Sequence, residues 1–177
     1  MDYITIATTG NASSFGTLTV SRESLAGVSS STRGVFGGGY ITSASAVMDY
    51  ITIATTGNAT NFGTLTLARQ SLAGVSSGTR GVFGGGTTTG GTGGESAVMT
   101  YITIATTGNG STFGNLTVAN FELAGVSSDI RGVFGGGYSS STVMSYITID
   151  TTANATNFGN LTVGRYGLAG VSGYLQQ

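Results

Sequence analysis

The sequence contains no histidine, cysteine, lysine, proline or tryptophan, and it has few charged residues of either sign. Without cysteine there are no disulfides, thiolate metal sites or thiol nucleophiles, and cysteine usage does not indicate a redox compartment. Without histidine as well, the usual nucleophile–base pairs of covalent catalysis cannot form. Charged residues make up 7% of the chain and the net charge is −1, so no strong field favours nucleic acid or an anionic membrane.

Long hydrophobic runs are also missing. No stretch is apolar over the eighteen or so residues that a membrane-spanning helix needs, so we expect no membrane insertion. The repeated pattern described below begins at Met1, so we also expect no signal peptide. The length suits a single domain, residues 1–177, with a proper core. Although 32 residues are glycine, apolar residues recur in a strict order that disordered chains lack.

The most informative feature that is present is an internal repeat. The segment MDYITIATTGNASSFGTLTV opens the chain and returns three times with small changes. The repeat units are residues 1–47, 48–98 and 99–143, followed by an incomplete unit, 144–177. Tyrosines mark their register at intervals of 47, 51 and 45 residues: Tyr3, Tyr50, Tyr101 and Tyr146. All of the length variation falls between a triple glycine and the next methionine.

Four segments of each unit are predicted to be short strands. VMDYITI and FGTLTV alternate apolar residues with threonine, as half-buried strands do, whereas LAGVSS and RGVFGG are short and rich in small residues. Clusters of Gly, Asn, Ser and Thr between them indicate turns, and no apolar stripe has helical spacing. Four strands in 45 to 51 residues are typical of one blade of a β-propeller.

The pattern R-x-x-L-A-G-V-S-S-x-x-R-G-V-F-G-G-G, followed by V-M-x-Y, resembles kelch repeats. In kelch proteins a glycine pair ends the second strand of each blade, and aromatic residues on the third and fourth strands pack between blades. The matching glycines here are Gly37–Gly39, Gly84–Gly86 and Gly135–Gly137. The resemblance implies an all-β, kelch-like propeller of four-stranded antiparallel blades, in which glycine lets the chain turn where neighbouring blades crowd together.

The two chain ends predict how such a ring closes. The chain starts with a third strand, Tyr3–Ile6, and a fourth, Phe15–Val20. It ends with a first strand, Leu168–Val171, and a stunted second strand, Gly173–Gln176. Pairing the two ends gives about four blades in a monomer. Two alternatives remain: two chains exchange their ends in an eight-bladed homodimeric ring, or the chain is a segment of a longer array.

Residues that could carry chemistry are few. The seven acidic residues form no repeated pair, and no serine lies in a G-x-S-x-G setting. The triple glycines have neither an adjacent Asp nor a following Gly-Lys-Ser/Thr, which argues against calcium and phosphate loops. We therefore predict no enzymatic activity, no metal site and no cofactor. Arg33, Arg80 and Arg131 begin the second strand of each blade, where we expect them to bond turn carbonyls.

A second set of residues, at the turn from the fourth strand into the next first strand, is the candidate binding site. Because strands alternate in direction, these turns share one face with the length-variable loops Tyr40–Ala46, Thr87–Ala97 and Tyr138–Thr142. Loops on a rigid scaffold often carry binding sites, although surface loops also vary when nothing restrains them. The predicted ligand-binding residues are Arg22, Arg69, Asn120, Arg165, Tyr40 and Tyr138.

The sequence of the whole repeat, with TRGVFGGG and YITIATTGNA as its most specific parts, resembles those of kelch-like repeat proteins of tailed bacteriophages, especially marine ones. This resemblance implies a virion structural or tail-associated protein, made in the bacterial cytoplasm, with other virion proteins or a host-surface glycan as partners and no nucleic acid. An alternative is a multivalent lectin-like propeller, with equivalent pockets between its blades that contain aromatics, Asn and Thr.

Overall fold

The computed structural model describes residues 1–172, which form strands, turns and loops but no helix. Strands β3–β6, β7–β10 and β11–β14 form three four-stranded antiparallel sheets in chain order, and β1–β2 form a two-stranded sheet. The prediction of an all-β chain with one four-stranded antiparallel sheet per full repeat is therefore confirmed. Membrane-spanning helices are absent from this part of the chain.

Equivalent strands have nearly the same bounds in the three sheets. The first sheet contains β3 (Ala26–Ser29), β4 (Arg33–Gly37), β5 (Val47–Thr52) and β6 (Thr60–Thr64). The second contains β7 (Ala73–Ser76), β8 (Arg80–Gly84), β9 (Val98–Thr103) and β10 (Ser111–Asn115). The third contains β11 (Ala124–Ser127), β12 (Arg131–Gly135), β13 (Val143–Thr148) and β14 (Thr156–Asn160), and the N-terminal pair is β1 (Asp2–Tyr3) and β2 (Ser13–Ser14).

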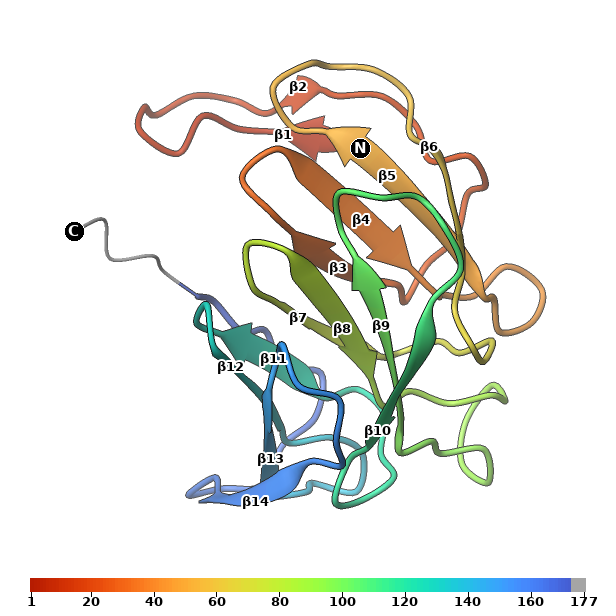
Figure 1. Ribbon diagram of the computed structural model, residues 1–177, viewed down its shortest axis with the longest axis vertical. Coiled ribbons are helices and arrows are strands. Elements are labelled where there is room, and N and C mark those ends of the chain that lie inside the picture. The colour runs from red at the N-terminus through yellow and green to blue at the C-terminus, as the bar shows by residue number, and fades with distance from the viewer. Residues whose placement is uncertain (173–177) are drawn as a thin grey trace.

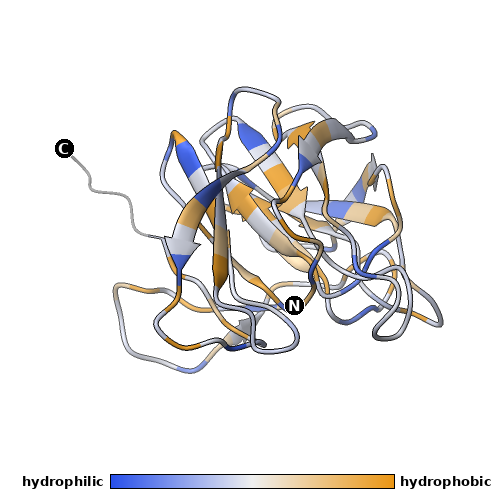
Figure 2. Cartoon of the chain, turned by 90° about the horizontal axis from the view of Figure 1, so that it is seen from below, coloured by the Kyte–Doolittle hydropathy of each residue, from blue (hydrophilic) through white to orange (hydrophobic). Residues whose placement is uncertain are grey.

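The sheets follow one another along an arc, with β1–β2 at one end and β11–β14 at the other (Figure 1). The first strands of successive sheets are neighbours, since β3 contacts β7 and β7 contacts β11. The apolar residues of the strands pack in two clusters, one between each pair of successive sheets. Figure 2 shows hydrophobic residues alternating with polar ones along the strands. Each sheet thus buries apolar residues against the next sheet, so no repeat forms a core by itself.

The triple glycines lie where two sheets meet. A Cβ at Gly37 would stand 2.9 Å from the ring of Phe83, which belongs to the next sheet and is fully buried. Gly38 has a φ of +71° and packs against the backbone of the following repeat, where a Cβ would stand 2.7 Å from the Arg69 carbonyl oxygen. The first glycine therefore accepts an aromatic ring and the second allows a close turn, as the crowding argument predicts.

The outer strands differ from the prediction. FGTLTV was expected to form the fourth strand, but β6 begins at Thr60 and ends at Thr64. A bulge at Phe62 shifts the register, so that Asn61 pairs with Asp49 and Gly63 with Met48. Gly63 also has a φ of +147° and packs so closely on the next repeat that a Cβ would clash with the Gly108 carbonyl oxygen. Pairing continues past Gly63 to Thr64, and a strand pattern in the sequence reveals neither the bulge nor the contact with the next repeat.

The chain ends are also shorter as strands than predicted. Strand β1 is Asp2–Tyr3 rather than Tyr3–Ile6, β2 is Ser13–Ser14 rather than Phe15–Val20, and this pair joins no other sheet. Leu168–Val171 is not a paired strand, although it lies beside β11. Gly170 packs so closely on β11 that a Cβ would clash with the Gly125 carbonyl, and the Ser127 N–H donates to Ser172 Oγ at 2.8 Å. The predicted strand Gly173–Gln176 lies outside the described residues.

Candidate functional site

The length-variable loops and the turns between sheets lie on one face of the molecule, as the sequence predicts. The Gly39 N–H donates to the Arg69 carbonyl at 2.8 Å, and the Arg69 N–H donates to the Ser45 carbonyl at 3.0 Å. Backbone bridges also join Glu23 to Tyr40 and Gln70 to Thr87. We call this surface, formed by residues 21–24, 38–46, 68–71, 85–97, 119–122, 136–142 and 165–167, the variable face. Backbone hydrogen bonds hold its loops to the connecting turns, and the Gly38 N–H also donates to the Val47 carbonyl of β5 at 3.0 Å.

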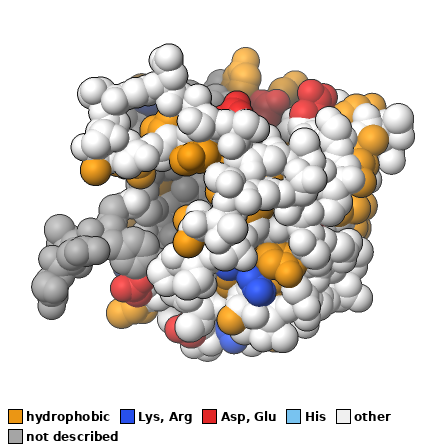
Figure 3. All heavy atoms as spheres, turned by 90° about the horizontal axis from the view of Figure 1, so that it is seen from above, with side chains coloured by type: hydrophobic (Ala, Val, Ile, Leu, Met, Phe, Trp, Pro, Cys, Tyr) orange, Lys and Arg blue, Asp and Glu red, His pale blue; other side chains and the backbone are white. Residues whose placement is uncertain are grey.

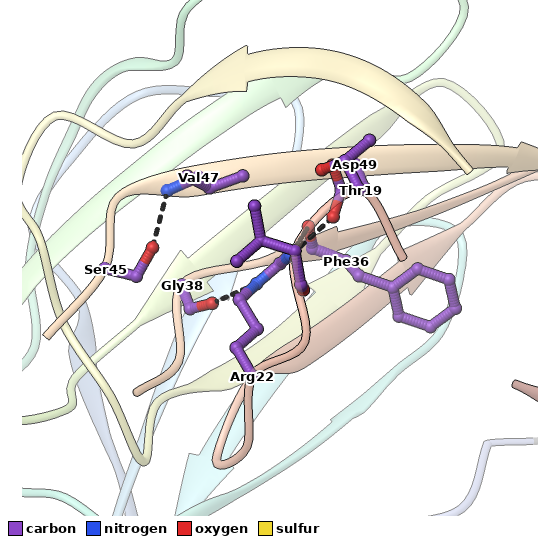
Figure 4. Close-up of polar contacts among 8 residues, drawn as sticks. Thr19, Arg22, Phe36, Gly38, Ser45, Val47 and Asp49 are labelled. Atoms are coloured by element: carbon purple, nitrogen blue, oxygen red, sulfur yellow. Dashed lines mark hydrogen bonds and ion pairs between the residues drawn. The ribbon is translucent and has the colours of Figure 1, made fainter. Parts of the chain in front are cut away.

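The Arg22 side chain points inward from the variable face, toward Asp49 and the Gly38 carbonyl (Figure 4). Its side chain forms an ion pair with Asp49 of β5, and both side chains are fully buried. Its Nε donates to the Gly38 carbonyl at 2.8 Å and its Nη2 to the Phe36 carbonyl at 3.1 Å, while Thr19 Oγ1 donates to Asp49. Arg22 therefore ties the turn that precedes β3 to β4 and β5 of the same sheet.

Arg69 occupies the same place in the next sheet but has no carboxylate partner, because Thr100 stands where Asp49 stands in the first sheet. Its Nη1 donates to the carbonyl of Gly85 at 2.8 Å and to that of Val98, and its Nη2 donates to Thr100 Oγ1 at 3.0 Å. Its Nε has no hydrogen-bond partner. Burial lowers the pKa of Arg69 from its usual range to about 10.

Asn120 and Arg165 continue this series. Asn120 Oδ1 accepts the Phe121 N–H at 2.9 Å, and Ser145 replaces the acidic partner in that sheet. Arg165 is exposed, and its Nε donates to the Val163 carbonyl at 3.3 Å. The predicted ligand contacts are thus not supported at Arg22 and Arg69, whose guanidinium groups are buried among backbone acceptors. Arg165 remains accessible on the variable face.

The predicted residues Tyr40 and Tyr138 both lie on the variable face, in different surroundings. Tyr40 is half-buried and its backbone bridges Glu23 and Ala44. Tyr138 is 39% exposed, stacks on Phe121 with ring centroids 4.7 Å apart, and lies 6.2 Å from the ring of Tyr166. We call Phe121, Tyr138 and Tyr166 the aromatic cluster. Tyr166 is 57% exposed.

Phe121 and Tyr166 were not among the predicted site residues, although they occupy the positions of Glu23 and Gln70 in the other repeats. The signal that could have found them is aromatic substitution at a turn position that carries polar residues in the first two repeats. Backbone bonds bring the three rings together: the Tyr138 N–H donates to the Phe121 carbonyl at 2.9 Å, and the Gly137 N–H donates to the Arg165 carbonyl at 2.9 Å.

The opposite face contains three equivalent pockets, which we call the repeat pockets. Their volumes are about 330, 350 and 220 Å³. Each lies between the phenylalanine of one repeat and the tyrosine, threonines and asparagine of the next; the first is lined by Phe15, Tyr50, Thr55 and Asn58 among others. The tyrosine of each pocket also meets the phenylalanine of its own repeat edge to face, with ring centroids 6.1 Å apart.

The first set of arginines belongs to this opposite face. The Arg33 guanidinium lies 4.3 Å from the ring centroid of Tyr50, and its Nη1 donates to the carbonyls of Ile104 and Ala105 at 3.0 and 2.9 Å. Arg80 repeats the arrangement over Tyr101, with a bond to the Ile149 carbonyl at 3.3 Å. The prediction that these arginines bond turn carbonyls is confirmed for Arg33 and Arg80. Arg131 shares only the ring contact, with its guanidinium 4.6 Å from the ring centroid of Tyr146.

Within residues 1–172 there is no group of three or more acidic side chains that could hold a metal ion. Figure 3 shows that charged side chains are sparse and scattered on the face drawn there. No protein-family model matches the chain, and no curated protein is similar to it.

Proposed function

We propose that the chain is a non-enzymatic β-propeller module that recognises a partner through its variable face. The observation that carries this proposal is that the segments that differ most between near-identical repeats come together on one face. Hydrogen bonds to the sheets hold them there, and an exposed aromatic cluster lies among them. Exposed aromatic rings on a rigid support are typical of binding surfaces.

The proposed propeller has four blades, the last formed from both chain ends. The apolar faces at these ends are complementary and uncovered. Phe158 is 47% exposed and Val126 38% exposed, whereas the equivalent residues Phe62 and Val28 are 2% and 5% exposed. Ile4, on the N-terminal half-sheet, is 62% exposed. Docking of residues 1–20 on β11–β14 would cover these side chains as in the other junctions.

Charged residues at the two ends support the same closure. Asp2 aligns with Asp49, and Arg165 aligns with Arg22, so the ends carry the same Arg–Asp combination that is buried in the first sheet. Both Asp2 and Arg165 are exposed. A cavity of about 420 Å³ is lined by Gly170 and Ser172 together with residues of β3, β4, β7 and β11, so residues near the C-terminus share a space with strands of the first sheet, which supports a ring.

Reversing the two charges tests closure. Asp2→Arg and Arg165→Asp should each lower the midpoint of thermal unfolding, because each places like charges in the proposed contact, and the double variant should recover most of the loss. Light scattering at 17.6 kDa supports the four-bladed monomer, and twice that mass supports the eight-bladed dimer. Additive losses in the double variant would contradict closure in either form.

For its biological setting we propose a structural or tail-associated component of a bacteriophage virion, with a host-surface glycan or another virion protein as partner. The support is the resemblance of the repeat to kelch-like phage proteins. An array of bacterial surface polysaccharides tests the glycan partner. The variant Tyr138→Ala/Tyr166→Ala should reduce binding at least about tenfold, the effect expected for exposed aromatic anchors. Unchanged binding by this variant would contradict recognition by the variable face.

A second candidate function is multivalent sugar binding at the repeat pockets, and three equivalent pockets lined by aromatic rings, threonine and asparagine favour it. Weak identical sites gain avidity from multivalency. The triple variant in which Thr55, Thr106 and Thr151 become Gln fills these pockets and leaves the variable face unchanged. Loss of glycan binding in this variant, but not in Tyr138→Ala/Tyr166→Ala, would assign the sugar site to the repeat pockets.

A further inference from the structure

The three repeat pockets occupy equivalent places in the fold but differ in size. The first and the second have volumes of about 330 and 350 Å³, whereas the third has a volume of about 220 Å³. Pockets that enclose small molecules in proteins usually have volumes of at least about 300 Å³. The first two pockets therefore reach the usual size of a ligand site, and the third does not.

The lining of the pockets indicates an uncharged ligand with many hydroxyl groups. Among the described residues, the lining consists of aromatic, aliphatic, hydroxyl and amide side chains together with glycine. The amide groups of the first two pockets are held in place, because Asn58 Oδ1 accepts hydrogen bonds from Thr17 and Asn109 Oδ1 accepts them from Thr64, all at 3.1 Å. Each amide keeps its NH₂ group as a donor beside the threonine hydroxyls. A neutral hexopyranose offers matching hydroxyl groups and apolar C–H groups.

One substitution distinguishes the small pocket from the two larger ones. Gly57 and Gly108 line the first and second pockets, and Ala153 stands at the same position of the repeat in the third. Every other residue that lines the third pocket has the same type as its counterpart in the first. The methyl group of Ala153 is therefore the difference in composition that accompanies the smaller volume.

Neither the backbone conformation nor the packing requires glycine at the first two of these positions. Gly57 and Gly108 do not have a positive φ, and a Cβ at either residue would meet nothing within 4 Å. Their N–H groups donate to the carbonyls of Phe15 and Phe62 at 2.8 Å, a bond that any residue except proline can make. A side chain at either position would extend into open space at the pocket, so the room that these glycines leave in the pocket explains them.

We propose that Gly57 and Gly108 each admit one neutral hexopyranose to the first and second repeat pockets, and that the Ala153 methyl group excludes it from the third. This inference rests on the second candidate function and adds its ligand class, the number of sites and the position that determines their size. One methylene group more or less in a pocket changes discrimination by roughly 10- to 200-fold. The third pocket therefore binds the same sugar at least about tenfold more weakly than the other two.

An NMR titration of the intact, isotopically labelled protein tests the inference, because the backbone N–H groups of Gly57, Gly108 and Ala153 report on the three pockets separately. The probes are the methyl pyranosides of glucose, galactose and mannose. For at least one probe we expect the Gly57 and Gly108 signals to shift together with a dissociation constant of roughly 1 mM, as for a weak ligand of this size. The Ala153 signal should shift only at concentrations at least about tenfold higher.

Exchanging the residues tests the assignment in both directions. The double variant Gly57→Ala/Gly108→Ala should weaken binding at the first two pockets at least about tenfold, and Ala153→Gly should give the third pocket an affinity similar to theirs. Gly78→Ala is the matched control. Gly78 lies in the turn between β7 and β8, away from the described lining of the repeat pockets, and its Cβ would also meet nothing within 4 Å. This variant should bind the sugar like the unmodified protein.

The possible results distinguish a failure of the inference from a failure of sugar binding itself. Equal shifts at all three pockets would overturn the inference and leave sugar binding at the repeat pockets intact. Full binding by Gly57→Ala/Gly108→Ala with unchanged circular dichroism, or no gain of binding in Ala153→Gly, would do the same. If none of the three N–H signals shifts with about 100 mM of any probe, the second candidate function fails together with the inference.

Discussion

Replacing Thr100 by Asp would give Arg69 the carboxylate that Arg22 already has in Asp49. Burial lowers the pKa of Arg69 from its usual range to about 10. At 1.36 kcal/mol per pKa unit, this difference corresponds to a penalty of about 3 kcal/mol on the charged side chain in the folded state. The new carboxylate also loses hydration. We therefore expect Thr100→Asp to raise the free energy of unfolding by about 1–2 kcal/mol at pH 7, less than the full penalty.

The pH dependence of the free energy of unfolding provides a second test of this prediction. Above pH 10 the unfolded chain binds more protons at Arg69 than the folded chain does, so the penalty on folding is relieved as the pH rises above 10. A paired Arg69 keeps its proton, so the advantage of Thr100→Asp should shrink above pH 10. Urea unfolding of both proteins from pH 7 to pH 10.5 measures this difference, and tyrosine ionisation affects both alike.

Ser145→Asp is the matched control. It places a carboxylate at the equivalent position of the third sheet, where Asn120 stands in place of the arginine. An unpaired buried carboxylate should lower the free energy of unfolding by about 2–4 kcal/mol. The reasoning is refuted if Thr100→Asp is no more stable than the unmodified protein at pH 7, or if the two aspartate variants are destabilised equally.

Two further predictions concern the junctions. Phe134→Ala should lower the free energy of unfolding by about 3–5 kcal/mol, as for a fully buried aromatic residue. Phe36→Ala should lower it by clearly less, because Phe36 is only half-buried. Similar losses for the two variants in urea unfolding would show that Phe36 is covered in solution. Asn109→Ala removes the acceptor of two bonds, from Thr64 N and Oγ1 at 3.1 Å each, and should cost about 1–2 kcal/mol by the same assay. No measurable loss would show that these bonds do not hold the repeats together.

Much of the architecture follows from local sequence. Alternation of apolar residues with threonine defines the third strand of each sheet, and Gly- and Asn-rich clusters define the turns, because both signals depend only on neighbouring residues. Antiparallel order then places the variable loops and the connecting turns on one face. The role of Arg33 also followed, since a charge repeated at a strand start is most simply explained by nearby turn carbonyls.

Other features depended on contacts between repeats and appeared only in the tertiary structure. The sequence does not show that Phe83 rests on Gly37 or that Gly63 packs against the Gly108 backbone. Nor does it show that Arg22 and Arg69 point inward while Arg165 points outward. The surroundings of an arginine side chain are set by residues far along the chain, such as Asp49 and Thr100. Local pattern therefore determined the strands and their order, whereas packing between sheets decided which polar residues are buried and which aromatic residues form the exposed cluster.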